Sequence, residues 1–217
     1  MPSDTRNRIV NASAELFRRQ GYTGTGLKQI VAEANAPFGS LYHFFPGGKE
    51  ELGAEVIRVA GAFFGRLFGS IAAEAPDPIA AMDEFFSGAA KTLIDTDYAD
   101  ACPIATVALE VANINEPMRN ATAEVFEAWI EQGTRGLMAA GLPQRQAREI
   151  TIHMIAALEG AFILSRATRT TEPLQITGEA LVCDLRLALG EPASRGAQRR
   201  GPTRRARPRP AATAKRS

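Results

Sequence analysis

The chain has 217 residues, of which 45% are hydrophobic and 23% charged, and its net charge is +1. This composition suits a folded chain with a core of ordinary size, and no 18-residue apolar run indicates a transmembrane helix. The first residues, MPSDTRNR, lack the apolar core of a secretory signal, and two cysteines are too few for a disulfide scaffold. We therefore expect a cytoplasmic protein.

The small net charge hides an uneven distribution of charged residues. Residues 191–217 contain nine Lys or Arg and one Glu, a net charge of +8, whereas residues 59–190 carry a net charge of −8. The first 58 residues have a net charge of +1. Because the acidic middle would repel phosphate, a nucleic acid would have to contact the N-terminal segment, the tail or both.

The first predicted helix runs from about Asp4 to Gln20 and ends at Gly21, since glycine commonly follows the last residue of a helix. One face carries apolar or small residues at the spacing of a helix packed against its neighbours. These residues are Ile9, Ala12, Ser13, Leu16 and Phe17. For the four arginines of this helix, a solvated surface and a phosphate contact both remain open.

Two short helices joined by a tight turn are predicted next. Thr25 is the expected N-cap of the first, and Asn35 tolerates the left-handed conformation that the turn requires. Pro37 fixes a φ angle suited to the start of the second helix, which spans Phe38 to Phe44. The buried face of the first helix is formed by Leu27, Ile30, Val31 and Ala34. This layout predicts a helix-turn-helix, whose second helix enters the major groove of DNA.

Candidate DNA contacts follow from position in this motif. Backbone N–H groups and a lysine at the start of the first helix suit phosphates. On the second helix, Ser40 suits a base edge and Phe38 a thymine methyl group. The candidates are Thr25, Gly26, Lys28, Pro37, Phe38, Gly39, Ser40, Tyr42 and His43. Leu41 and Phe45 are expected to be inward anchors. The other interpretation of the segment is a helical hairpin packed for structure alone.

The rest of the chain is expected to be helical, because no period-2 alternation bounded by turn signals predicts a strand. The predicted helices cover residues 49–73, 79–94, 103–114, 116–140, 144–168 and 173–189. The tail is rich in Arg, Pro and Ala, so it cannot form a core and should be disordered. It acts either as a sequence-independent DNA-binding arm or as a solvated extension.

Several segments resemble the TetR family of bacterial repressors. The sequence LYHFF at residues 41–45, followed by KEEL at 49–52, looks like the family's DNA-binding head. FPGGKE at 45–50, CPIA at 102–105 and NEPMR at 115–119 are similar to its LmrA/YxaF-like branch. Together these matches span about residues 6–189.

This resemblance implies roles for particular positions of the head. Lys49 resembles the family's phosphate-binding lysine at the start of the next helix. Two positions depart from the pattern: Phe38 stands where this branch usually has a basic residue, and Phe44 where the family usually has His. The family's detailed contacts are therefore not transferred to those two residues.

The resemblance also implies an all-α architecture in three parts. A three-helix DNA-binding head covers residues 1–52, a ligand-binding and dimerisation body covers 53–190, and the tail covers 191–217. In such a homodimer the last two long helices of two chains form a four-helix bundle, which places two heads on one palindromic operator. The candidate dimer contacts are Ile150, Leu158, Phe162, Leu181 and Leu185. The other interpretation is that these faces pack against the chain's own body.

Aromatic and methionine side chains of the body favour an apolar cavity for a flat, hydrophobic effector, although core filling explains them as well. The candidate wall residues are Phe63, Phe86, Cys102, Leu109, Met118, Phe126, Trp129, Met154 and Phe162. The resemblance implies antibiotics or flavonoid-like aromatics that release the repressor from DNA. The hypothesis is that ligand swings the fourth helix and changes the separation of the two heads.

No enzymatic function is indicated. The two histidines, His43 and His153, are far apart in the sequence, and the cysteines lack a CxxC spacing, so no zinc site or other cofactor is expected. Glu110, Glu159 and Asp184 fall in apolar stretches, where such acids are either buried or, more often, face solvent. Two functions remain: a ligand-responsive repressor, or a non-specific architectural DNA-binding protein driven by the tail. Specificity in the presence of competitor DNA separates them.

Overall fold

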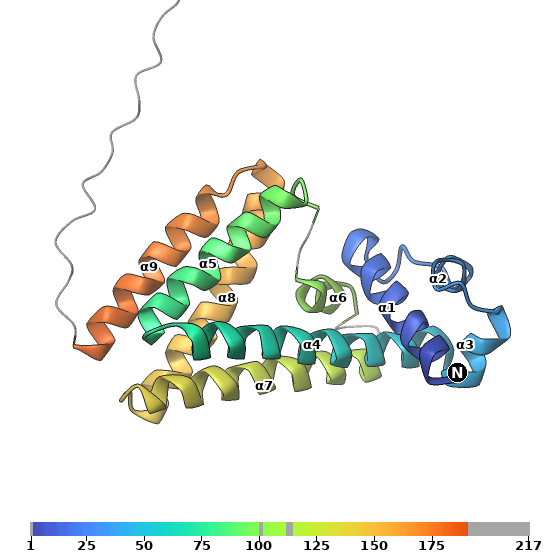
Figure 1. Cartoon of the computed structure of the whole chain (residues 1–217), viewed down its shortest axis with the longest axis horizontal. Coiled ribbons are helices and arrows are strands. Elements are labelled where there is room, and N and C mark those ends of the chain that lie inside the picture. The colour runs from blue at the N-terminus through green and yellow to red at the C-terminus, as the bar shows by residue number, and fades with distance from the viewer. Residues whose placement is uncertain (1, 100–101, 112–114, 191–217) are drawn as a thin grey trace, which may run out of the picture.

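The structure is a computed structural model that describes residues 2–99, 102–111 and 115–190 (Figure 1). Within these residues the chain forms nine α-helices and no strand, which confirms the all-α fold class. In chain order the helices are α1 (Pro2–Gln20), α2 (Leu27–Glu33), α3 (Phe38–Phe44), α4 (Gly48–Glu74), α5 (Pro78–Asp95), α6 (Pro103–Val111), α7 (Glu116–Ala139), α8 (Gln144–Thr168) and α9 (Glu172–Leu189). The predicted disordered tail lies outside the described residues.

Most predicted helix boundaries agree with the structure to within two residues. Helices α3 and α8 match at both ends. Helix α6 ends at Val111, and its predicted continuation to Ile114 lies outside the described residues. Asn35 takes the left-handed conformation that was predicted for the turn, with φ 46°.

The predicted cap of α2 is wrong. Its N-cap is Gly26, and no side chain bonds to its first turn. Thr25 is buried and instead donates its hydroxyl to the carbonyl of Gly21, with an O–O distance of 2.7 Å. Because Gly21 has φ 78°, the chain reverses there sharply enough for this side chain to close the turn back onto α1.

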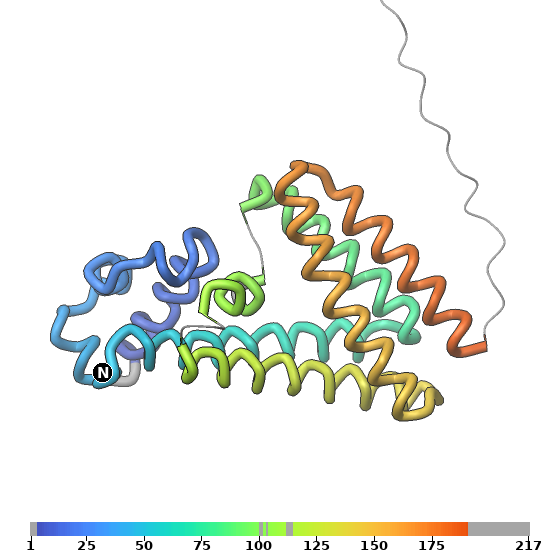
Figure 2. The backbone as a smooth tube through the Cα atoms, turned by 180° about the vertical axis from the view of Figure 1, so that it is seen from behind, coloured from blue at the N-terminus to red at the C-terminus, as the bar shows by residue number. Residues whose placement is uncertain are grey.

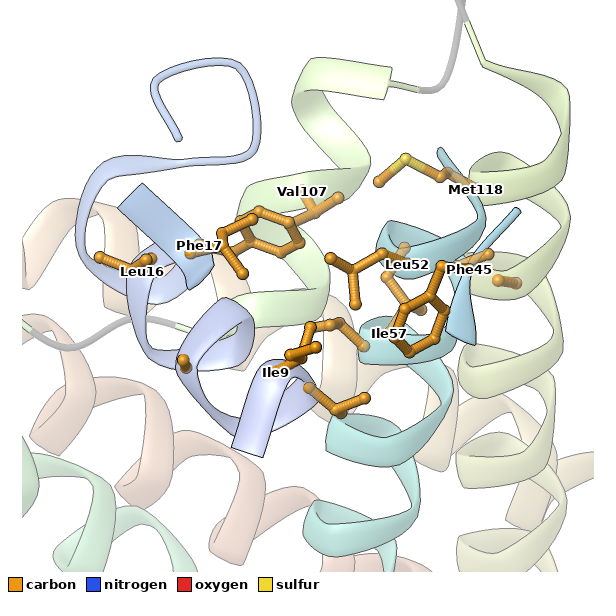
Figure 3. Close-up of a cluster of buried hydrophobic side chains, with 14 of the residues drawn as sticks. Ile9, Leu16, Phe17, Phe45, Leu52, Ile57, Val107 and Met118 are labelled. Atoms are coloured by element: carbon orange, nitrogen blue, oxygen red, sulfur yellow. The ribbon is translucent and has the colours of Figure 1, made fainter. Parts of the chain in front are cut away.

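One hydrophobic core joins the head to the first part of the body. Figure 3 shows Ile9 and Phe17 of α1 gathered with Leu52 of α4, Val107 of α6 and Met118 of α7. This cluster extends across the predicted boundary between residues 52 and 53, because α4 is one continuous helix that serves both parts. The head is therefore anchored to α6 and α7 as well as to α4.

Helices α4 and α7 lie side by side over much of their length (Figures 1 and 2). A Cβ atom at Gly61 would lie 2.4 Å from Val125, so the close approach requires glycine. The indole N–H of Trp129 donates to the Gly61 carbonyl, and the amide of Gln132 donates to the Gly65 carbonyl, both at 2.9 Å. The two helices are thus joined by hydrogen bonds as well as by packing.

A second core lies at the far end of the body, between α5, α8, α9 and the end of α7. Figure 2 shows α8 and α9 side by side in front of α5. The buried side chains of this core are Ile79, Met82, Phe86, Ala90, Leu93, Leu137, Leu142, Ala147, Leu158, Ala161, Leu174, Leu181 and Leu185.

Helices α4 and α8 are long and apolar enough to cross a membrane, judged by length and composition alone. No transmembrane helix was predicted, because neither segment contains 18 consecutive apolar residues. Each helix packs along one side against its neighbours, α4 on α1 and α7, and α8 on α7 and α9. α4 therefore contributes to the first core and α8 mainly to the second.

Candidate DNA-binding surface and body cavity

The turn between α2 and α3 is held from α1. Arg8 donates from Nε to the carbonyl of Ala34 at 3.0 Å and from Nη2 to the carbonyl of Asn35 at 3.4 Å. These carbonyls are among those that the end of α2 leaves without helical partners. Arg8 was expected to lie on the surface, either solvated or in contact with phosphate. Its hydrogen bonds to the turn were not predicted, because they join residues 26 and 27 positions apart in the sequence.

The recognition helix α3 presents its predicted face to solvent. Phe38 and Tyr42 are 45% and 48% exposed, and their ring centroids lie 5.9 Å apart. Pro37, Gly39 and His43 are also exposed, and Ser40 is half-buried. The predicted inward anchors Leu41 and Phe45 are buried, which confirms the expected orientation of the helix.

The candidate phosphate contacts differ in accessibility. Gly26 and Lys28 are exposed at the start of α2, whereas Thr25 is only 1% exposed. Thr25 therefore does not present a surface to DNA in this structure, and its bond to Gly21 gives it a structural role. Lys49 is half-buried, with its Nζ 4.2 Å from the centre of the Tyr22 ring.

The glycine corner fixes the start of α4. The backbone N–H of Gly47 donates to Oε2 of Glu51 at 2.7 Å, and Gly48 has φ 69°. Burial lowers the pKa of Lys49, the next residue, while the charge of Glu110 acts in the opposite direction. The corner thus places the cation of Lys49 beside the head, and among the described residues no carboxylate forms a salt bridge with it.

A cavity of about 420 Å³ lies between α4, α5, α7 and α8. Its wall is mostly apolar: Phe68, Ile71, Ala72, Ala75, Pro76, Asp77, Pro78, Ala81, Met82, Phe85, Trp129, Gln132, Gly133, Gly136, Leu137, Ala139, Ala140, Thr151, Met154 and Ile155. A second, shallower hollow of about 480 Å³ follows the seam between α4 and α7 and shares Trp129 and Gln132 with the first.

Of the nine predicted wall residues, Trp129 and Met154 line the cavity between α4, α5, α7 and α8. Phe63 and Leu109 are instead 55% and 78% exposed. The others pack into the two cores: Met118, Cys102 and Phe126 in the first, and Phe86 and Phe162 in the second. Helical spacing identified mostly side chains that turn inward, with Phe63 and Leu109 as exceptions, but it does not show which gap between helices stays open.

The predicted dimer contacts are mostly core residues of the chain itself. Leu158, Leu181 and Leu185 are 6% exposed or less, and Ile150 and Phe162 pack against the same core. The structure therefore supports the other interpretation for these five residues. A different apolar set on α8 and α9 is exposed, and we call it the α8/α9 face. It consists of Ile152, Ala156, Gly160, Ile163, Ile176, Ala180, Cys183 and Leu187.

One acid of the body has an unusual environment. Burial raises the pKa of Glu159 on α8 to about 7. Burial, followed by the charge of Glu159, raises the pKa of the Cys102 thiol well above its ordinary value. The thiol is therefore protonated near neutral pH and is a poor nucleophile. Among the described residues, no group of three His, Cys, Asp or Glu side chains is placed to hold a metal ion.

An exposed recognition helix on an all-helical body defines a helix-turn-helix regulator of transcription. Residues 9–56 match the family model for bacterial regulatory proteins of the tetR family, and residues 78–180 match the C-terminal domain of LmrA/YxaF-like transcriptional regulators. The HTH-type transcriptional regulator YxaF of Bacillus subtilis is 35% identical over 178 residues, which cover 82% of this chain and 93% of YxaF. The chain belongs to the TetR family, in its LmrA/YxaF-like branch.

Other comparisons agree with this assignment. The HTH-type transcriptional regulator LmrA of Bacillus subtilis is 32% identical over 171 residues, which cover 79% of this chain and 91% of LmrA. In fold, the chain is similar to the reduced form of Escherichia coli NemR, with a TM-score of 0.72 at 21% identity over 82% of this chain and 95% of NemR. A TetR regulatory protein from Rhodobacter sphaeroides has the same TM-score and identity, over 81% and 96% of the two chains.

Proposed function

We propose that the protein is a dimeric repressor that a small hydrophobic effector releases from a palindromic operator. The observation that carries this proposal is the course of α4. The helix begins at Gly48 beside the recognition helix and continues without a break to Glu74, where Phe68, Ile71 and Ala72 form part of the cavity wall. A ligand that displaces one end of α4 therefore acts on the same rigid element that holds the head.

The cavity suits a neutral, flat ligand. Its volume of about 420 Å³ falls within the range of pockets for drug-sized molecules, and the rings of Phe68, Phe85 and Trp129 form part of its mostly apolar wall. Two of its polar side chains already have partners, since Gln132 donates to the Gly65 carbonyl and Thr151 donates to the Ala147 carbonyl at 2.8 Å. A charged ligand would lose its hydration shell on entering the cavity and would find few polar groups in the wall to hydrogen-bond with instead.

The α8/α9 face supports a homodimer. Its members recur at intervals of three or four residues on each helix, so they form one apolar stripe per helix. Gly160 has open space around it, which permits close approach of a second chain. A two-fold dimer buries the same patch on both chains and presents two recognition helices to the two halves of a palindrome. One short recognition helix alone supplies few specific contacts.

Release from DNA follows from a difference in affinity. If the effector binds more tightly to a conformation in which α4 has moved, it stabilises that conformation. The stabilisation equals the difference between the effector's binding free energies for the two conformations and cannot exceed it. The operator loses affinity by the same factor, because the two ligands are linked through one equilibrium. Candidate aromatics that bind without changing DNA affinity would contradict this coupling.

The test is fluorescence anisotropy of the full chain with DNA that flanks its own gene, against scrambled DNA at near-physiological salt. We expect tight binding to the flanking DNA only, with two chains per site by light scattering. Tyr42→Ala should reduce operator affinity by about tenfold or more, the loss typical of a side chain at a base-contacting surface. Phe63→Ala, which removes an exposed aromatic ring from the body end, is the matched control and should bind as the unaltered protein does.

The alternative is non-specific binding driven by the basic tail. Equal affinity for both DNAs, falling uniformly as salt rises, would favour it and contradict the proposal. The exposed and outward-facing recognition helix supports specific binding, because a helical hairpin packed for structure alone has no reason to expose two neighbouring aromatic rings.

A further inference from the structure

The short helix α6 contacts the head through one carboxylate. Oε1 of Glu110 accepts a hydrogen bond from the backbone N–H of Tyr22 at 3.1 Å, and Oε2 accepts one from the N–H of Thr23 at 2.7 Å. The donors belong to the turn that joins α1 to α2, 87 and 88 residues earlier in the chain. Glu110 thus connects an element of the body to the DNA-binding head.

The turn is shaped around this carboxylate. Gly21 has φ 78°, and the N–H groups of the next two residues converge on the two oxygens of Glu110. Successive backbone N–H groups after such a bend form a concave anion-binding site. A Cβ atom at Gly21 would lie 2.2 Å from Oε1 of Glu110, so glycine is required for the oxygen's position as well as for φ.

The same turn leads directly to the DNA-binding surface. The hydroxyl of Thr25 is bonded to the Gly21 carbonyl, and its N–H to the Tyr22 carbonyl at 3.2 Å, so residues 21–25 form one compact unit. Helix α2, with its candidate phosphate contacts, begins immediately after this unit. Lys49, at the start of α4, lies over the Tyr22 ring of the same turn, and the negative charge of Glu110 favours its protonated form.

Helix α6 is itself fixed in the core between head and body. Ile104, Val107 and Val111 are 1% exposed or less, and Figure 3 shows Val107 beside Phe17 of α1. In both views of the backbone, α6 lies between the head and the far bundle (Figures 1 and 2). A shift of α6 relative to α1 would therefore strain the two hydrogen bonds of Glu110, because they join the C-terminal end of α6 to the turn that follows α1.

We propose that Glu110 is a positioning residue for DNA binding: its carboxylate holds the α1–α2 turn, and with it the start of α2 and Lys49, in the orientation that fits the operator. This inference rests on the proposed function and identifies a second connection, besides α4, between body and head. Loss of the carboxylate frees the turn and lowers operator affinity while the two cores stay intact.

The experiment compares Glu110→Gln and Glu110→Ala with Glu84→Gln, an exposed acid on α5, in the full chain. Hydrogen exchange of the peptide that contains residues 21–25 is measured without DNA, and operator affinity is measured by anisotropy. Because a lost hydrogen bond to a charged group is worth about 1.5–3 kcal/mol, exchange of the Tyr22 and Thr23 amides should accelerate roughly tenfold to a hundredfold. Operator affinity should fall about tenfold in Glu110→Ala. It is measured far below the melting temperature of every variant, so that all the proteins are fully folded.

Each arm has a result that overturns the proposal. Unchanged exchange at residues 21–25 in Glu110→Ala would show that the carboxylate does not hold the turn. Faster exchange with unchanged operator affinity would show a purely structural contact, and so would an equal affinity loss in Glu84→Gln. If the unaltered protein does not prefer its operator, the proposed function fails and the DNA-binding role of Glu110 falls with it, while the exchange arm still decides whether the contact holds the turn.

Discussion

The two ends of α4 are packed in opposite ways. At the head end, Leu52, Val56 and Ile57 are buried among side chains of α1, α6 and α7. At the body end, Phe68 and Ile71 border a cavity of about 420 Å³. A rigid helix that is tightly packed at one end and faces open volume at the other is suited to carry a displacement from the cavity to the head, because the packed end cannot absorb it.

The largest expected effect tests the packed end. Leu52→Ala removes a fully buried side chain from the core shared by head and body, and should lower the free energy of unfolding by about 3 kcal/mol. Leu67→Ala on the same helix removes a side chain that is 41% exposed and should cost less than about 1 kcal/mol. Urea denaturation measures both. Equal losses would mean that the two ends of α4 do not differ in packing as described.

A smaller effect is expected at Glu159 on α8, a half-buried acid whose carboxyl lies within hydrogen-bonding reach of Cys102. The pKa of Glu159 is about 7 in the folded protein, above the ordinary value of 4.5 that it regains on unfolding. The folded state therefore favours the neutral acid, so stability falls as pH rises from 4.5 to about 7 and then levels off. Over this window the loss should be about 2–3 kcal/mol.

Glu159→Gln should remove this contribution to the pH dependence and should raise stability above pH 7. Thermal or urea denaturation at pH 5 and pH 8 measures the difference. The matched control is Glu84→Gln, which replaces an exposed acid and should retain the slope of the unaltered protein. If Glu159→Gln retains that slope as well, the carboxyl of Glu159 is ionised and solvated in the folded protein.

The regions also differ in how far the sequence predicts them. Helix α3 and the left-handed Asn35 were predicted because their signals are local: a proline, an asparagine and apolar residues at helical spacing. The hydrogen bonds between Glu110 and the turn were not predicted, because they join residues almost 90 positions apart in the sequence. Glycine at position 21 signalled a helix end, and only the structure shows that it also leaves room for a carboxylate.

The same limit explains the errors in the body. Spacing identified Leu181 and Leu185 as one apolar face of α9, and the face is indeed buried, but against α5 and α8 of the same chain. Phe63 follows the same helical pattern as its buried neighbours and is nevertheless exposed. The partner of an apolar face depends on how helices cross, and periodicity in one helix contains no information about that crossing.

The smallest effect on stability tests the open end of α4. Ala72 and the adjacent Ala73 are both exposed, but only Ala72 borders the cavity. Ala72→Leu should occupy part of the cavity and change stability by less than about 1 kcal/mol, because empty volume is available and no side chain must be displaced. Trp129 is the one tryptophan of the chain and lines the cavity, so its fluorescence reports what binds there.

Aminoanthracene, a neutral aromatic probe, should quench Trp129 in the unaltered protein and in Ala73→Leu, and bind about tenfold more weakly to Ala72→Leu, because the added side chain excludes it from apolar contacts. Equal quenching in all three proteins would place the probe elsewhere, since Trp129 also borders the outer seam between α4 and α7. Loss of quenching only in Ala72→Leu locates the ligand at the body end of α4. On the proposed function, a displacement of the helix from there would reach the recognition head through the packing of Leu52, whereas a ligand in the outer seam would contact α4 where Gly61 already packs closely against α7.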